Sequence, residues 1–257
     1  INKYHDMSII ERGANQPGDI EYLCNIADPT HGLITNISTA HLEGFQTVDN
    51  ILKTKGALFN YMNKGIAYVN YADDRLKTIE IKGKKITYGL NAECDFPADI
   101  HHDDDGSLVL TIDSRELKTK SKNLSFAKNI IACCAVAREL QVKWDAIEDR
   151  IHTFNPPKGR CEVKYNGNYT IIDDSYNANL ESTLAALDYL NAFSGSGNKI
   201  FILGDMLELG TSSESQHREI AKKCNDLNIN AIMTYGKETK ITNKYVNCLL
   251  YTSPSPR

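Results

Sequence analysis

Two polar residues near the start of the chain have the chemistry to hold Mg²⁺ beside a phosphate. Glu11 supplies a hard oxygen ligand and His41 an imidazole, although Mg²⁺ normally keeps several of its waters. Lys55 follows on the next predicted helix, where the fold could bring it close to His41. Judged by residue type alone, His41 is more often an ordinary polar loop residue and Lys55 a solvated helix lysine, so both interpretations stay open.

A second polar group spans residues 173–179, with the sequence Asp-Asp-Ser-Tyr-Asn-Ala-Asn between an apolar strand and a helix. Ser, Asn and Asp at such a junction cap the helix in any α/β domain. Capping explains one or two of these residues. Two acids, a tyrosine and two asparagines exceed that need, and they suit the binding of a ribose or a small polar substrate.

Two other acidic segments have a simpler interpretation as turns. Residues 203–210 open a polar loop at a strand end, where we expect a turn with an exposed acid. The run Asp103–Asp105 follows His101 and His102 and could be interpreted as a metal cluster. A gapless run cannot point all of its ligands inward, so we expect a solvated hairpin or loop tip.

The elements that must position these residues alternate between strands and helices. We expect strands at residues 8–11, 32–37 and 65–70, and helices at residues 19–27 and 47–62. This order predicts a parallel sheet with helices on its faces. Glu11 and His41 then follow strand ends, where α/β sheets bind their ligands.

The next stretch, residues 79–112, changes character. Its strand-like alternation and its turns at residues 83–85 and 104–106 predict an antiparallel excursion within the domain. Apolar helices are expected after it, at residues 126–140 and 144–154.

A domain boundary is expected at Pro156-Pro157-Lys158-Gly159, because this sequence breaks both helix and strand. We assign residues 1–155 to a first domain and residues 156–248 to a second. In the second domain the strands and helices alternate again, at residues 169–173, 180–192, 199–203, 213–227 and 231–235. This alternation predicts another doubly wound, Rossmann-like α/β domain.

Composition limits the classes of protein that fit. The 257 residues carry a net charge of −4, with 41% hydrophobic and 24% charged residues. The chain has no sustained basic face of the kind that binds nucleic acid. It has no run of about 18 apolar residues, so no membrane span is predicted. The first residues also lack the apolar core of a signal peptide. Seven cysteines without CxxC spacing suit reduced thiols, so we expect a cytoplasmic protein.

Taken in order, these segments resemble the Mur ligase family over approximately residues 8–236. The resemblance is carried by IIERGANQPGDI, GLITNISTAHLEGF, the KTKG helix, GRCEV, IIDDSYNANLEST and ILGDMLELG. DDSYNAN and GDMLELG are most similar to the branch of the family that adds D-alanyl-D-alanine. The resemblance implies a central ATPase-type parallel-sheet domain, truncated at its N-terminal side, followed by a Rossmann-like C-terminal ligase domain.

The resemblance also implies the chemistry of peptidoglycan synthesis. ATP phosphorylates the carboxylate of UDP-N-acetylmuramoyl-tripeptide, and the amine of D-alanyl-D-alanine attacks the acyl phosphate. Carboxylate is a poor electrophile because loss of oxide is prohibitive, so phosphorylation supplies a leaving group. Mg²⁺ and cationic side chains stabilise the developing charge. We expect a monomer that binds no nucleic acid.

Site residues follow from the resemblance position by position. Glu11 looks like the Mg²⁺-binding acid and His41 like the ligand of a second Mg²⁺. Lys55 resembles a lysine that family members carry as a carbamate, an anion able to support that metal, and Lys53 is the alternative if the register differs. The residues similar to nucleotide contacts are Asn129, Arg160 and Asp174. The residues in the motif that holds the incoming dipeptide are Tyr176, Asn177 and Asn179.

The chain departs from the family pattern in several places. The phosphate-binding motif G-x-x-x-x-G-K-[ST] occurs nowhere in it, and Ser125 and Phe126 stand where the family has His-Asn. We expect the C-terminal domain to stop early. Residues 249–257 look like a non-native tail of translated adaptor sequence, with a native Pro-rich tail as the alternative. Without the phosphate loop, we expect the chain to be inactive by itself.

Other interpretations remain. A sister ligase that adds another amino acid is the nearest, and DDSYNAN argues against it. A nucleotide-binding α/β module that has lost the chemistry would have no need of the full set of polar residues. A wholly unrelated pair of Rossmann-like domains is the third.

Overall fold

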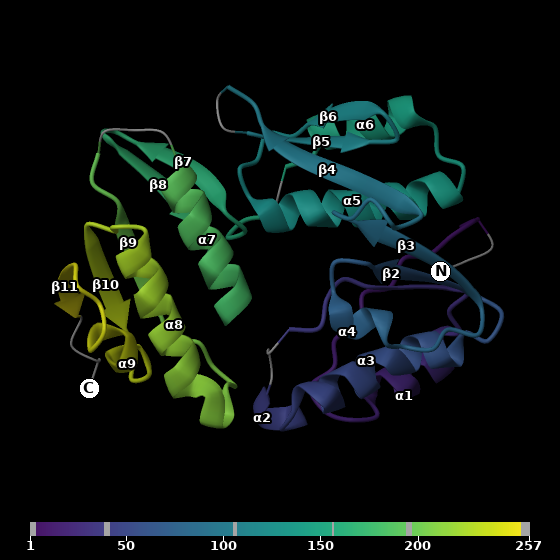
Figure 1. Ribbon diagram of the computed structural model, residues 1–257, viewed down its shortest axis with the longest axis horizontal. Coiled ribbons are helices and arrows are strands. Elements are labelled where there is room, and N and C mark those ends of the chain that lie inside the picture. The colour runs from purple at the N-terminus through teal and green to yellow at the C-terminus, as the bar shows by residue number, and fades with distance from the viewer. Residues whose placement is uncertain (1–3, 39–41, 105–106, 156, 194–196, 253–257) are drawn as a thin grey trace.

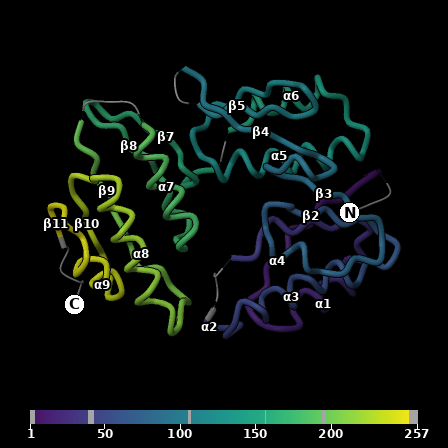
Figure 2. The backbone as a smooth tube through the Cα atoms, viewed as in Figure 1, coloured from purple at the N-terminus to yellow at the C-terminus, as the bar shows by residue number. Residues whose placement is uncertain are grey.

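The computed structural model describes residues 4–38, 42–104, 107–155, 157–193 and 197–252. These residues form two α/β units that follow one another along the chain (Figure 1). The first unit ends after helix α6, and the backbone continues from there into the second (Figure 2).

The first unit is built on one six-stranded sheet. Its strands lie in chain order, and the four strands β1 to β4 are parallel while β5 and β6 run antiparallel. The strands are β1 (His31–Ile34), β2 (Ile66–Asn70), β3 (Lys84–Gly89), β4 (Phe96–His102), β5 (Leu108–Ile112) and β6 (Arg115–Lys118). β1 therefore occupies one edge of the sheet.

Helices cover this sheet on both sides, so the unit has two apolar cores (Figure 1). The core around Ile51, Phe59 and Val69 lies between the sheet and helices α3 and α4. The other core contains Leu110 and Ile131 and lies against helices α5 and α6. The helices of this unit are α1 (Asp19–Ala27), α2 (Leu42–Phe45), α3 (Val48–Tyr61), α4 (Asp74–Lys77), α5 (Leu124–Glu139) and α6 (Trp144–Thr153).

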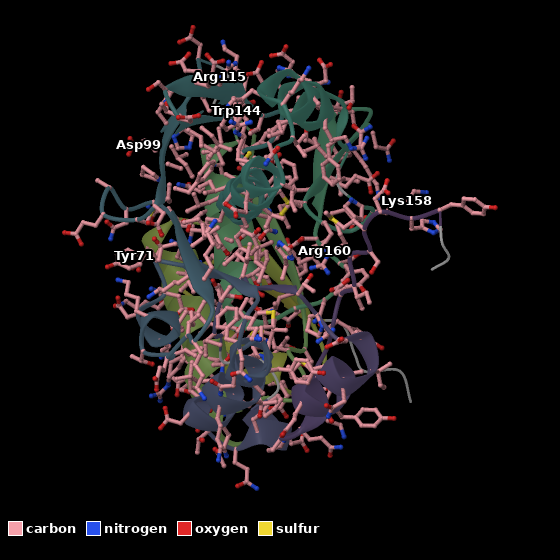
Figure 3. All side chains as sticks on the ribbon, turned by 90° about the vertical axis from the view of Figure 1, so that its right-hand side faces the viewer. Tyr71, Asp99, Arg115, Trp144, Lys158 and Arg160 are labelled. Atoms are coloured by element: carbon pink, nitrogen blue, oxygen red, sulfur yellow. The ribbon has the colours of Figure 1, made fainter. Side chains whose placement is uncertain are left out.

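Trp144 fixes the last helix of the first unit. Its indole Nε1 donates to Asp113 Oδ2 at 3.1 Å, and the Arg115 guanidinium lies 5.7 Å from its ring centroid. Figure 3 shows Arg115 beside Trp144 at one end of the molecule, away from Arg160. The contacts of Trp144 with Asp113 and Arg115 thus hold this end of the molecule, which lies apart from Arg160.

The second unit has a parallel three-stranded sheet in the order β11-β10-β9, and an antiparallel hairpin of β7 and β8. Its core, around Leu187, Leu203, Ile220 and Ile232, lies between the sheet and its two long helices. The elements are β7 (Glu162–Asn166), β8 (Tyr169–Asp173), α7 (Leu180–Ala192), β9 (Ile200–Gly204), the 3₁₀ helix η1 (Gly210–Ser212), α8 (Ser213–Asp226), β10 (Ala231–Tyr235), α9 (Thr239–Asn243) and β11 (Leu249–Thr252).

Side-chain caps fix where several helices begin, which is at the predicted residue for α7 and within two residues of it for α3 and α5. The Thr47 hydroxyl accepts from the Asn50 amide at the start of α3, and Asn123 accepts two amides at the start of α5. Asn179 forms a capping box with Ser182 at the start of α7. Each cap satisfies backbone donors that the helix leaves open, at about 1 kcal/mol apiece.

Some expectations about the strands are wrong. Residues 8–11 form no strand, because no described strand lies beside them to take their hydrogen bonds, and Ile9 is 92% exposed. Lys84 and Lys85 belong to β3 and not to a turn. β3 pairs in parallel with β2, so the antiparallel part is confined to β4, β5 and β6.

The loop between β4 and β5 agrees with the prediction in its described part. The expected hairpin tip at Asp103–Asp105 is confirmed where it is described, because His102 pairs with Leu108 across β4 and β5, while residues 105–106 lie outside the description.

Leu249–Thr252 form β11 in parallel with β10, so the strand pattern continues four residues further than we expected. Among the helices that the structure describes, none has both the length and the apolar character needed to cross a membrane.

Candidate functional site

Lys55 lies at the end of β1, with its amine half-buried. From α3 its Nζ donates to the backbone carbonyl of Asn36 at 3.3 Å. Burial lowers the pKa of Lys55, and the carboxylates of Asp73 and Glu181 partly oppose this shift. The interpretation of Lys55 as a solvated helix lysine is therefore wrong; Lys53, by contrast, is exposed.

The segment that receives Lys55 is fixed by side chains of the neighbouring strand. Asn70, at the end of β2, donates to the Thr35 carbonyl at 2.8 Å. Asp73 accepts the Ile37 amide at 2.7 Å through one carboxylate oxygen, and caps α4 through the other. Since both oxygens of Asp73 are engaged by backbone amides, this carboxylate anchors the loop and is poorly placed to be a metal ligand.

The second unit reaches the same segment through α7. The side-chain amide of Asn36 donates to Glu181 Oε2 at 2.7 Å. Glu181 lies in the first turn of α7, directly after the polar residues 173–179. The structure thus brings Lys55 together with the start of α7, a meeting that the sequence interpretation did not include.

The other expected metal ligands are placed only in part. Glu11 is exposed and lies in the irregular segment before α1, and His41 lies outside the described residues. In the described ranges no three His, Cys, Asp or Glu side chains are grouped so that they could hold a metal ion. Glu11 offers a carboxylate, and Lys55 would offer carbamate oxygens after carbamylation. These oxygen donors suit Mg²⁺, and the Mg²⁺ site that they would form stays a prediction.

A second cluster joins three of the expected residues. The Arg160 guanidinium lies over the Tyr176 ring, 4.0 Å from its centroid. The Asp174 carboxylate accepts the Cys161 amide at 3.0 Å, and burial raises the pKa of Asp174. Gly159 accepts the Tyr176 amide at 3.1 Å and has a φ of +71°, a conformation that favours glycine. Arg160, Tyr176 and Asp174 therefore form one face near the junction of the two units.

The start of α5 extends this cluster. Asn123 donates from Nδ2 to the Cys161 sulfur at 2.9 Å while its oxygen caps the helix. Asn129, one of the expected nucleotide contacts, is exposed in the second turn of α5. Asn123 was missed by the sequence interpretation, although an asparagine directly before an apolar helix is itself a signal for a cap.

The two expected dipeptide contacts differ. The Asn179 side chain accepts the Ser182 amide at 2.9 Å, so helix capping accounts for it. Asn177 is exposed, and its oxygen accepts the amide of Ala178 at 2.9 Å. Asn177 is not the cap of α7, which leaves it the better candidate for a ligand contact.

The acid of the loop at residues 203–210 has a structural role. Asp205 accepts the amides of Lys237 and Thr239 at 2.8 and 2.9 Å and so fixes the start of α9. Further along the loop, the Glu208 carbonyl accepts the Glu43 amide at 3.1 Å. This is a second contact between the units, and the expectation of a simple turn omits it.

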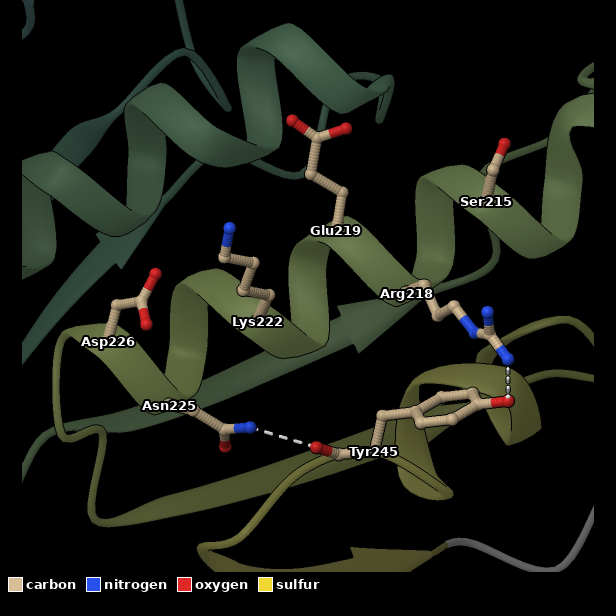
Figure 4. Close-up of a pocket in the computed structure, with 7 residues that line it drawn as sticks. All are labelled: Ser215, Arg218, Glu219, Lys222, Asn225, Asp226 and Tyr245. Atoms are coloured by element: carbon tan, nitrogen blue, oxygen red, sulfur yellow. Dashed lines mark hydrogen bonds between the residues drawn. The ribbon is translucent and has the colours of Figure 1, made fainter.

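One surface depression lies near these side chains, and another lies along α8. A depression of about 570 Å³ follows α8 and includes Arg218 and Tyr245, which form a hydrogen bond at 2.5 Å (Figure 4). It contains none of the expected site residues. A smaller one, about 390 Å³, lies between Thr47 and Val48 of the first unit and Leu180 and Ser212 of the second. Both units line the smaller depression, close to the start of α7.

Fold and site together define a two-unit α/β protein whose polar residues meet where the units join. Family comparison agrees with this class: residues 1–137 match the Mur ligase middle domain and residues 159–246 match the Mur ligase, glutamate ligase domain. The chain belongs to the Mur ligase family.

Two curated relatives carry the same name. The UDP-N-acetylmuramoyl-tripeptide–D-alanyl-D-alanine ligase of Haemophilus influenzae is 30% identical over 254 residues, covering 96% of this chain and 55% of the relative. The Escherichia coli enzyme of the same name is 29% identical over 245 residues, covering 91% of this chain and 54% of the relative. The chain thus spans about half the length of the curated relatives it matches.

Solved structures agree with the fold. MurF from Acinetobacter baumannii superimposes with a TM-score of 0.88 at 26% identity, covering 98% of this chain and 56% of that one. MurF ligase from Thermotoga maritima, solved in complex with ADP, gives a TM-score of 0.82 at 26% identity, covering 93% of this chain and 56% of that one. The predicted fold class is therefore confirmed.

Proposed function

We propose that this chain is part of a MurF-type ligase, which uses ATP to join D-alanyl-D-alanine to UDP-N-acetylmuramoyl-tripeptide. The observation that carries the proposal is the meeting of Lys55 with the first turn of α7, directly after the DDSYNAN motif. The names of the relatives agree with it. As part of the proposal, residues 1–155 and 156–248 are the central and C-terminal ligase domains, and the protein is cytoplasmic and monomeric.

Lys55 contributes through its amine. Because burial lowers the pKa of Lys55, a larger share of this amine is neutral than in a solvated lysine at the same pH. A neutral amine can attack CO₂, forming an N–C bond and releasing a proton, to give a carbamate. Glu11 would then hold one Mg²⁺, and His41 with the carbamate would hold a second; these ions, when bound, would stabilise charge on the phosphoryl oxygens.

The Arg160 cluster serves the nucleotide. The Arg160 guanidinium lies over the Tyr176 ring, which keeps it extended and its donors available to an anion. Asp174 is the acid for the nucleotide ribose, and Asn129 faces the adenine. Asn177 orients the incoming dipeptide, whose amine attacks the acyl phosphate with loss of phosphate.

The test is a phosphate-release assay on the restored protein, meaning this chain extended to the full length of the curated relatives. We expect turnover that requires ATP, Mg²⁺, UDP-N-acetylmuramoyl-tripeptide and D-alanyl-D-alanine, and that disappears in Lys55→Ala and His41→Ala. The 257-residue chain, which has no G-x-x-x-x-G-K-[ST] motif, should show none. Activity with a single amino acid in place of the dipeptide would move the assignment to a sister ligase.

A further inference from the structure

Glu181 is the one acidic side chain that the described contacts bring from the second unit to the Lys55 segment. Its Oε2 accepts the Asn36 side-chain amide at 2.7 Å, and the Asn36 carbonyl in turn accepts Lys55 Nζ at 3.3 Å. Glu181 also acts on Lys55 through its charge, as one of the two carboxylates that oppose the effect of burial on its pKa. One residue of the first unit thus links Glu181 to Lys55.

Both sides of this contact are held in place independently. On the side of the first unit, Asn70 and Asp73 fix the backbone of residues 35–37. On the other side, the Asn179 capping box fixes the first turn of α7, which carries Glu181. Because neither partner has to be ordered by the contact, its strength is available to hold the two units together.

A second contact nearby has a different character. The Glu43 amide donates to the Glu208 carbonyl at 3.1 Å, and this bond depends on backbone atoms alone. The hydrogen bond between Asn36 and Glu181, by contrast, joins two side chains, so a substitution can remove it selectively.

We propose that Glu181 is a positioning residue, which holds the first turn of α7 against residues 35–37 and so sets how closely the 173–179 motif approaches Lys55. The consequence for ligation rests on the proposed function, whereas the contact and its effect on the arrangement of the units do not. No role in the chemistry itself is assigned to Glu181.

The test measures the distance between the units in the 257-residue chain. Spin labels on genetically encoded ketone residues at Asn60 in α3 and Lys222 in α8, both exposed, avoid the native thiols. We expect Glu181→Ala to shift the population from the wild-type distance to longer distances by about fivefold, the factor that a hydrogen bond of ordinary net strength gives. Glu181→Gln keeps an acceptor and should stay within about twofold of wild type.

Two controls separate positioning from a general loss of stability. Asp188→Ala removes the ion pair between Asp188 on α7 and Lys223 on α8, at 2.6 Å, which lies wholly within the second unit. It should leave the distance distribution unchanged. Asn36→Ala should reproduce the effect of Glu181→Ala, and the double variant should add nothing to either, because both substitutions break the same bond.

The proposal is overturned if Glu181→Ala keeps the wild-type distance distribution, or if Asp188→Ala changes it equally. It is also overturned if the effects of Asn36→Ala and Glu181→Ala add in full. None of these outcomes depends on ligase activity. A failed ligation assay with a positive distance result would reject the proposed function alone.

Discussion

The Arg160 guanidinium lies over the Tyr176 ring, 4.0 Å from its centroid, and so links the start of the second unit to the loop before α7. An exposed cation–π contact of this kind contributes about 0.5–1 kcal/mol. If its role is to keep Arg160 extended toward a nucleotide, Tyr176→Ala should weaken ADP binding to the restored protein by about two- to fivefold. Isothermal titration calorimetry gives the dissociation constants.

Tyr176→Phe separates the ring from the hydroxyl. The phenylalanine ring keeps the contact with Arg160, so ADP affinity should match wild type. If Tyr176→Phe weakens binding as much as Tyr176→Ala does, the hydroxyl is the group that matters, and the stacking role of Tyr176 is wrong.

Asn179 allows a direct comparison of capping with substrate binding. Its side chain accepts the Ser182 amide at 2.9 Å, so Asn179→Ala should lower the free energy of unfolding by about 1 kcal/mol. Asn179→Asp keeps an acceptor at the helix start and should restore that stability. Urea unfolding of the 257-residue chain, followed by circular dichroism, measures both.

The same pair of variants then tests function. An aspartate cap carries no amide donor, so if Asn179 also binds the dipeptide, Asn179→Asp in the restored protein should be stable but show a raised KM for D-alanyl-D-alanine. An unchanged KM would leave Asn179 as a cap and Asn177 as the ligand contact.

The fold was predictable where local signals and periodicity agree. The helix at Asp19–Ala27 has the predicted bounds, and the helix at Val48–Tyr61 differs by its cap residues alone. Residues 8–11 show the limit of this approach. Their apolar pattern is strand-like, but a strand also needs a neighbour, which local sequence does not specify. The short hairpin strand β7 was missed although its residues, Glu-Val-Lys-Tyr-Asn, alternate between polar and apolar; none of its side chains is fully buried, so it lacks the apolar character of a core strand.

The site was predictable to a different degree. The motif resemblance assigned Arg160 and Asp174 to the nucleotide and Tyr176 to the dipeptide, and the structure places the Arg160 guanidinium over the Tyr176 ring. Glu181 could not be found in this way. Its contact with Asn36 joins residues 145 positions apart, and a glutamate in the first turn of a helix is common for reasons of the helix dipole alone.

Acid sensitivity is expected at the β7–β8 hairpin. Lys164 Nζ lies 2.6 Å from Asp173 Oδ2, and together with the bonds from Ser175 it lowers the pKa of Asp173 to about 2 from 3.8. Since the folded pKa is lower than the unfolded one, the stabilisation is present in full above pH 3.8 and is lost as the pH falls toward 2. Partial exposure limits it to about 0.5 kcal/mol.

The corresponding experiment compares wild type with Lys164→Met. The variant should unfold at lower urea concentration at pH 6, and the difference should shrink as the pH falls from 4 to 2. A difference that stays constant over this range would mean that packing of the lysine stem, and not its charge, supports the hairpin.

Gly236 is required by the carboxylate of Asp205. An added Cβ at Gly236 would lie 2.1 Å from Asp205 Oδ1, and the φ of +132° is a conformation that side-chain-bearing residues rarely adopt. Gly236→Ala must therefore move Asp205 away from the Lys237 and Thr239 amides, breaking the start of α9. We expect a loss of about 3 kcal/mol or more in the free energy of unfolding, from the strain and the unsatisfied donors together.

Gly204, at the end of β9, provides the matched control. A Cβ there has no heavy atom within 4 Å, and β9 is a neighbour of β10 in the same sheet. Gly204→Ala should change the free energy of unfolding by less than about 1 kcal/mol. Thermal unfolding of the two variants side by side provides the test. If Gly236→Ala destabilises the protein as little as Gly204→Ala does, Asp205 can move without consequence and its contacts do not fix α9.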